Sequence, residues 1–105
     1  MQRGEVWWAD LLLPSGRRPV VLLSRNAVYR IKDSCTIGPI TRTIRGIPSE
    51  VRLGPEDGLS SECVVNLDNI MTIPRAQFIR RIAALSADKI NAVDLAIIFA
   101  LGLGE

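Results

Sequence analysis

The side chains of this chain that suit catalysis or binding are arginine, threonine, serine and a few scattered acids. The sequence contains no histidine, which excludes the Ser-His-Asp and Cys-His arrangements and imidazole acid–base catalysis. It has no glycine-rich loop ending in Lys-Ser or Lys-Thr, and no cluster of carboxylates that would hold two metal ions. The remaining side chains suit phosphate recognition and the stabilisation of negative charge.

Arginine dominates the basic residues, with eleven arginines among the thirteen. Arginine offers phosphate a planar fork, whereas lysine offers a point charge. The net charge of +2 is too small to indicate nucleic acid by itself, so the positions of the arginines carry the argument. The alternative explanation for any single arginine is that the arginine-rich composition only reflects a GC-rich genome. The arginines gather at Arg17 and Arg18, at Arg42 and Arg45, and at Arg75, Arg80 and Arg81.

One reaction fits this inventory without a cofactor or a metal, namely transesterification of RNA, in which the 2′-hydroxyl of the substrate attacks the adjacent phosphate. Because the substrate brings the nucleophile, the protein need only hold the chain, neutralise charge on the phosphoryl oxygens and move protons. Arg18 suits the charge role, Thr41 can hydrogen-bond a phosphoryl oxygen, and Asp68 can accept a proton. A guanidinium is a poor proton donor, so the general acid stays unassigned.

Each of these residues also has a structural interpretation. Arg18 can be a solvated residue at the start of a strand, Thr41 a residue chosen for β propensity, and Asp68 a turn or capping residue. For Trp7 and Trp8, a place in the core or in an interface is favoured over a base-stacking role.

The elements that must position these residues are mainly short strands, organised around an opening hairpin. Its first strand runs from Val6 to Leu13 and its second from Pro19, joined by the turn Pro14-Ser15-Gly16. Gly38-Pro39 indicates a bulge or an edge position. Further strands are predicted over 35–41, 47–53, 61–67, 70–73 and 78–82, with a loop or single helical turn over 27–33 and a helical turn over 75–77.

Only the C-terminal part is predicted to form a longer helix. Ser86 is a suitable N-cap, Gly102 is placed to end the helix, and an apolar stripe lies between them, made of Ile90, Val93, Ile97 and Leu101. Several short strands closed by one helix predict a single domain over residues 1–105, mainly β, in which closure of a small barrel protects the strand edges. The apolar share of 48% is high for a lone monomer and predicts a homodimer.

Cys35 and Cys63 have no metal-binding spacing, so a reduced pair is expected. The N-terminus lacks the apolar core of a signal peptide, and the C-terminal apolar run is broken by Asp94. A soluble, cytoplasmic protein is therefore expected.

Four stretches, in this order and spanning nearly the whole chain, resemble the MazF/PemK family of toxin endoribonucleases of type II toxin–antitoxin systems. They are Arg3-Gly4-Glu5-Val6-Trp7-Trp8-Ala9-Asp10-Leu11, Gly16-Arg17-Arg18-Pro19-Val20-Val21-Leu22-Leu23-Ser24, Pro39-Ile40-Thr41 and the stretch from Val65 to Ile73. The resemblance implies an SH3-like barrel, a homodimer with its sites near the interface, and metal-independent cleavage of single-stranded RNA. It also implies 2′,3′-cyclic phosphate and 5′-hydroxyl ends, and an antitoxin whose flexible tail covers the site.

By position, Arg18 matches the family's catalytic arginine before proline, Thr41 its catalytic threonine or serine, and Asp68 an acidic position that is the base in some members. The chain departs from the pattern in its short first loop, in Asn66 where some members carry a catalytic arginine, and in Met71 where arginine is common. The predicted RNA-binding residues are Arg17, Ser24, Arg25, Arg42, Asn66 and Asn69.

Two other functions are compatible with this sequence. The first is a non-enzymatic poison on the same fold that binds a topoisomerase such as gyrase. Toxins of that kind typically bind through a C-terminal aromatic residue, and residues 101–105 contain none. The second is a catalytically silent RNA-binding barrel, which the residues Asn66 and Met71 make conceivable.

Overall fold

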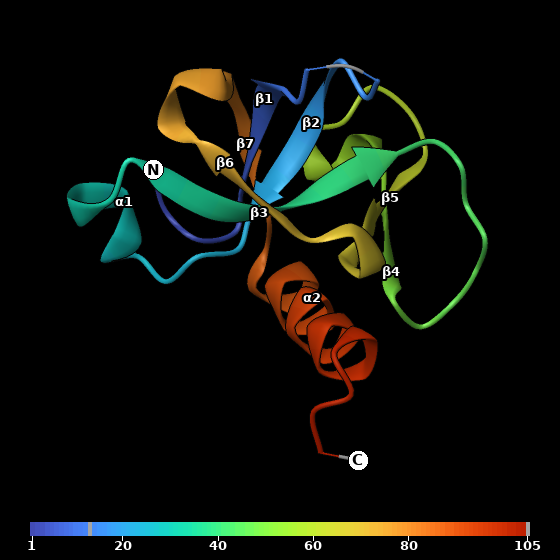
Figure 1. Cartoon of the computed structure of the whole chain (residues 1–105). Coiled ribbons are helices and arrows are strands. Elements are labelled where there is room, and N and C mark those ends of the chain that lie inside the picture. The colour runs from blue at the N-terminus through green and yellow to red at the C-terminus, as the bar shows by residue number, and fades with distance from the viewer. Residues whose placement is uncertain (13, 105) are drawn as a thin grey trace.

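The computed structural model describes residues 1–12 and 14–104, and it shows one curved antiparallel sheet with a helix against one face (Figure 1). Among these residues no helix is long and apolar enough to span a membrane. The strands are β1 (Glu5–Asp10), β2 (Arg17–Leu22), β3 (Ser34–Thr41), β4 (Glu50–Leu53), β5 (Cys63–Asn66), β6 (Met71–Pro74) and β7 (Phe78–Ala84). The helices are α1 (Val28–Ile31) and α2 (Ala87–Ala100), with 3-10 turns η1 (Pro55–Asp57), η2 (Leu67–Asn69) and η3 (Arg75–Gln77).

The strands follow the order β4-β5-β3-β2-β1-β7, and β6 adds to β3. The prediction of a mainly β fold with a C-terminal helix is confirmed. The barrel is not fully closed, however, because β4 and β7 end the path and do not pair with each other in the described parts of the chain. An open seam therefore separates β7 from β5 and β4.

Three predicted strands are too long, and the one predicted over 61–67 spans only Cys63–Asn66. The first ends at Asp10, because the Asp10 carboxylate accepts a hydrogen bond from the backbone N–H of Leu12 at 2.9 Å and Leu12 has a φ of 65°. The prediction extended this strand to Leu13, which lies outside the described residues. The strand predicted over 47–53 begins only at Glu50, whose Oε1 accepts the backbone N–H groups of Arg45 at 3.0 Å and Gly46 at 2.9 Å.

Gly38 and Pro39 lie where β3 changes its neighbour. On one edge of β3, pairing with β6 ends at Ile37 and pairing with β5 begins at Ile40, so the two residues between them need no ladder partner there. This change of partner explains why Gly38-Pro39 indicates a bulge or an edge position in the sequence. Gly38 is also required sterically, because a Cβ would lie 2.9 Å from Cγ2 of Val65.

Helix α2 begins as predicted, because the Ser86 hydroxyl accepts the backbone N–H of Lys89 at 3.3 Å. It packs against the sheet through its buried residues Val93 and Ala96. Leu101, predicted to be part of this stripe, is 59% exposed because the helix ends at Ala100. The apolar surplus lies largely on the outer side and the end of this helix, at Leu95, Ile98, Phe99, Leu101 and Leu103.

The two tryptophans of β1 point to opposite faces of the sheet. Trp7 packs against the second buried cluster and makes an edge-to-face contact with Phe78, with 6.2 Å between the ring centroids. Trp7 therefore is the core aromatic that was expected. Trp8 points to the other face, where the seam lies.

Gly58 is the tightest point of that seam, because a Cβ there would lie 2.7 Å from the Cβ of Ala83 on β7, and its φ is +92°. We expect Gly58→Ala to lower the free energy of unfolding by about 2 to 4 kcal/mol, from backbone strain plus overpacking. Gly46→Ala is the control, because Gly46 has a φ of +72° with open space around it. It should cost only about 1 kcal/mol. If urea unfolding gives the same loss of free energy for both variants, the close contact between Gly58 and Ala83 is contradicted.

Candidate active site

Arg18 and Thr41 come together at one end of the sheet. Val20 of β2 pairs with Pro39 of β3, and continuing this antiparallel register by two residues puts Arg18 opposite Thr41. The Arg18 side chain reaches across to β3, where Nη1 donates to the carbonyl of Ile40 at 3.5 Å. Two of the three predicted catalytic residues are thus neighbours.

The Arg18 guanidinium has hydrogen-bonding capacity to spare. Its Nη2 donates to the carbonyl of Ser15 at 3.3 Å, but its buried Nε has no acceptor in the described residues. Across residues 1–12 and 14–104, Arg18 also forms no ion pair with a carboxylate. The Thr41 hydroxyl accepts the backbone N–H of Thr43 at 3.2 Å and keeps its own proton for donation. Together these groups present unused hydrogen-bond donors at one corner of the sheet, which is chemistry that suits an anion.

Asp68 lies away from this corner. Thr41 pairs with Val64 on β5, whereas Asp68 comes four residues later, in the turn η2 that follows β5. Its carboxylate accepts a hydrogen bond from the buried Ser49 hydroxyl at 2.5 Å, and its backbone N–H donates to Asn66 at 2.9 Å. These contacts are those of a turn residue that anchors the chain before β4.

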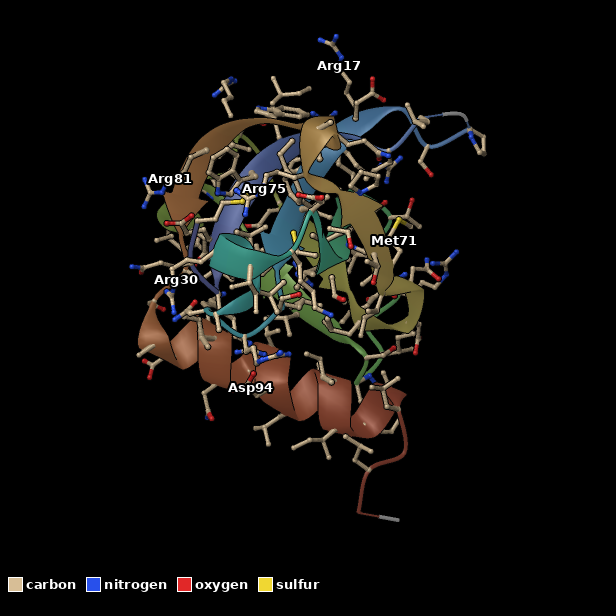
Figure 2. The ribbon with its side chains drawn as sticks, turned by 60° about the vertical axis from the view of Figure 1, so that its left-hand side comes forward. Arg17, Arg30, Met71, Arg75, Arg81 and Asp94 are labelled. Carbon is tan, nitrogen blue, oxygen red and sulfur yellow. The ribbon has the colours of Figure 1, made fainter. Side chains whose placement is uncertain are left out.

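The predicted RNA-binding residues fall into two groups. Arg17 is exposed at the start of β2 (Figure 2), and Arg42 is exposed directly after Thr41, so both lie at the Arg18 end. Ser24 and Arg25 lie beyond the opposite end of β2, where the Ser24 hydroxyl accepts the backbone N–H of Thr36 at 2.8 Å.

The two asparagines lie with Asp68. Asn66 is buried at 7% exposure, and its side chain caps η2 by accepting the backbone N–H of Asp68. Asn69 is exposed in the same turn. Of the six predicted RNA-binding residues, the structure therefore brings only Arg17 and Arg42 beside Arg18 and Thr41.

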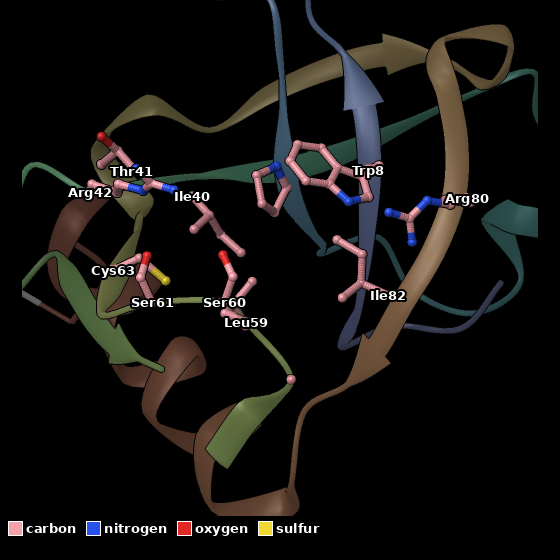
Figure 3. A pocket seen from close by; sticks show the side chains of 12 residues that line it. Trp8, Ile40, Thr41, Arg42, Leu59, Ser60, Ser61, Cys63, Arg80 and Ile82 are labelled. Atoms are coloured by element: carbon pink, nitrogen blue, oxygen red, sulfur yellow. The ribbon is translucent and has the colours of Figure 1, made fainter. Parts of the chain in front are cut away.

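A pocket of about 400 Å³ opens in the seam next to Thr41 (Figure 3). Sequence reasoning missed it, because one wall comes from β1 and β7 and the other from the end of β3 and the segment 58–63, and no local pattern records their approach. In the register of β1, Trp8 pairs with Pro19 on one side and Arg80 on the other. The lining residues are Trp8, Pro19, Ile40, Thr41, Arg42, Gly58, Leu59, Ser60, Ser61, Cys63, Arg80 and Ile82.

Cys63 contributes a thiol to the pocket wall, but this thiol is not activated. Burial raises the pKa of Cys63, and the nearby carboxylates of Glu62 and Asp57 raise it further. Burial likewise raises the pKa of Cys35, which lies in the other buried cluster. Both cysteines are free, and within the described chain no three His, Cys, Asp or Glu side chains form a group suited to a metal ion.

Comparison with known proteins gives one consistent answer. Residues 2–101 match the model of a family described as PemK-like, MazF-like toxin of type II toxin-antitoxin system. The chain is 44% identical over 92 residues to the "Probable endoribonuclease MazF2" of Mycobacterium tuberculosis (strain ATCC 25618 / H37Rv), covering 87% of this chain and 88% of that protein.

Two solved structures are similar over nearly their full lengths. "Mycobacterium tuberculosis toxin MazF-mt6" superposes with a TM-score of 0.89 at 35% identity, covering 96% of this chain and 99% of that chain. An "Endoribonuclease in complex with its cognate antitoxin from Mycobacterial species" gives a TM-score of 0.88 at 31% identity, covering 100% and 98%.

The state of the two cysteines is directly testable. We expect neither thiol to react appreciably with a disulfide reagent such as Ellman's reagent at pH 7 while the chain is folded, because both are buried and neutral. Both should react at once in denaturant. Because each raised pKa delays thiolate formation, reactivity of the folded protein should rise only well above pH 9. Rapid native labelling at pH 7 would contradict this description of the pocket wall.

Proposed function

Because the chain belongs to the family of PemK-like, MazF-like toxins of type II toxin–antitoxin systems, we propose that it is an endoribonuclease that cuts single-stranded RNA and so inhibits translation and growth. The observation that carries this proposal is the Arg18 guanidinium, which has a buried, unpartnered Nε among the described residues and lies opposite Thr41. A cation with unused donors fits a phosphate group.

The proposed reaction is attack of the substrate's 2′-hydroxyl oxygen on the adjacent phosphorus. The bond from phosphorus to the 5′-oxygen breaks, which leaves a 2′,3′-cyclic phosphate and a 5′-hydroxyl. The proton lost by the 2′-hydroxyl is balanced by the one gained at the 5′-oxygen. Negative charge grows on the non-bridging oxygens as the bond forms, and donors aimed at those oxygens lower the barrier. Arg18 donates to one of them and Thr41 to another, so the step needs no metal ion.

Asp68 has a different proposed role. Its carboxylate holds Ser49, while the Glu50 carboxylate holds the backbone of Arg45 and Gly46. These contacts fix the segment 42–49, which leaves β3 directly after Thr41 and carries Arg42. We therefore place Asp68 as a positioning residue, and the proton acceptor and the general acid stay unassigned.

The assembly and partners follow from the same premise. The exposed apolar side of α2, with Leu95, Ile98 and Phe99, is the natural interface of a homodimer. A similar endoribonuclease has been solved with its cognate antitoxin, and we propose that this chain is also neutralised by an antitoxin that covers the site. Residues 1–105 act as a single toxin domain, and the place of action is the cytoplasm.

The central test is replacement of Arg18 by alanine. We expect cleavage of a long single-stranded RNA in EDTA to fall by about 10² to 10³-fold, because one transition-state donor is lost. Arg30→Ala removes the same charge from an exposed position on α1 and should leave cleavage unchanged. Mapping of the product ends should show a recurring short sequence and a cyclic phosphate, with the DNA counterpart intact.

Full cleavage by Arg18→Ala would contradict the site. Intact RNA after incubation with folded, dimeric wild-type protein would instead favour a topoisomerase-binding poison or a silent RNA-binding barrel.

The role of Asp68 is tested by Asp68→Asn. The amide oxygen of asparagine still accepts the Ser49 hydroxyl, so we expect kcat to fall by less than about tenfold. A general base would instead contribute about 10² to 10⁴-fold. Single-turnover rates across pH separate the two roles, because loss of a base also removes the acidic limb of the pH profile. A large loss together with a flattened profile would restore Asp68 as the base.

A further inference from the structure

The pocket in the seam plays no part in the chemistry described above, although Thr41 lies at its rim. We propose that it binds the base of the nucleotide next to the scissile phosphate, with Trp8 as the stacking surface and Arg80 as a second contact. Trp8 and Arg80 are then specificity-determining residues. This inference rests on the proposed endoribonuclease function and adds the part of the substrate that the pocket accepts.

The walls of the pocket have the chemistry that a nucleobase requires. On one side, Trp8, Ile82 and Arg80 come from β1 and β7, and on the other side Arg42 and Ser61 follow β3 and precede β5 (Figure 3). An aromatic face stacks on any base, and hydroxyl groups can bond to base edges as donor or acceptor. A flat ring with polar edges therefore fits this site.

The charges beside the pocket favour an anionic ligand. Arg42 and Arg80 are both exposed and form no ion pair within residues 1–12 and 14–104. No acidic residue is among those lining the pocket. The volume of about 400 Å³ lies in the range of small-molecule sites. A base attached to a sugar and a phosphate meets all three conditions, whereas a purely apolar side chain would leave the two cations unused.

The position of the pocket links it to the catalytic pair. Along β2 successive side chains alternate between faces, so Arg18, paired with Ala9, points away from the face of Pro19, which is paired with Trp8. Thr41, which lies opposite Arg18 in the extended register, and Arg42 both line the pocket as well. An RNA chain crossing this end places its scissile phosphate against Arg18 and Thr41 and the neighbouring base in the pocket.

The first experiment measures binding without cleavage. The chain has two tryptophans, so a Trp7→Phe background leaves Trp8 as the only indole. Titration with AMP, CMP, GMP and UMP should change its fluorescence saturably for at least one nucleotide. Adding Arg80→Gln should weaken this binding by about fivefold or more, while adding Arg30→Gln should not alter it.

No fluorescence change with any nucleotide, from protein shown to be folded, would overturn the proposal. So would saturable binding of N-acetylphenylalanine amide in place of the nucleotides, because the pocket would then receive a side chain of a protein partner. Nucleotide binding by a protein that does not cleave RNA would support the pocket and contradict the endoribonuclease function.

The second experiment measures the base preference of RNA cleavage. We expect Trp8→Leu to lose about tenfold or more of the base preference at one position beside the cut, because stacking on the indole is lost. Trp8→Phe should keep that preference. If Trp8→Leu does not fold, Arg80→Gln serves instead, since this side chain is exposed. Unchanged preference, measured by sequencing product ends from a random RNA pool, would overturn the assignment.

Discussion

The change of partners along β3 is the constraint on which the rest of this structure depends. The strand pairs with β2 on one edge, and on the other edge it pairs first with β6 and then with β5. Gly38 lies at the switch, and its missing side chain lets Val65 and Leu67 approach the backbone. Because β5 can then pair alongside the last residues of β3, Thr41 is held in place between Val64 and the Arg18 side of the sheet.

The arginine side chains have two uses in this structure. Some form ion pairs that hold parts of the fold together, and others gather around Thr41. Arg3 binds Asp94 at 2.7 Å and ties α2 to the sheet, and Arg81 binds Glu5 at 3.3 Å across β1 and β7. The arginines around Thr41 differ: within the described residues Arg17, Arg18, Arg42 and Arg80 make no ion pair. Arg25, Arg30, Arg45 and Arg75 make no ion pair in the described residues either. The gathering of four arginines at one strand end, and not the absence of ion pairs, is what fits a phosphate-binding function better than a composition effect of the genome.

The features that could be predicted from sequence are those that local chemistry determines. Turn residues delimit the first hairpin, Ser86 marks the start of α2, and the motif around Arg18 and Thr41 identified a pair that the fold then brought together. The positioning role that we propose for Asp68 could not be predicted from the sequence, because it rests on a hydrogen bond to Ser49, nineteen residues away. The alternation of Trp7 and Trp8 predicts opposite faces. The pocket on the face of Trp8 could not be predicted in this way. It depends on Arg80 and on the unclosed seam, and no local sequence pattern records either.

An incompletely closed barrel separates two tasks that a sequence-selective nuclease must combine. The groups proposed to stabilise charge lie on the adjacent strands β2 and β3, just beyond the ladder pair Val20 and Pro39, and the Arg18 side chain donates to the carbonyl of Ile40. The pocket has one wall from β1 and β7, which pair with each other, and an opposite wall from the end of β3 and the segment 58–63, and no ladder joins β7 to β4 or β5 in the described residues. Substitutions at Trp8 or Arg80 can therefore alter which ligand fits without touching Arg18, because the pocket meets the Arg18 site only at Pro19, Ile40 and Thr41. Full closure of the sheet would have strengthened the fold but would have left no place beside Thr41 for a base.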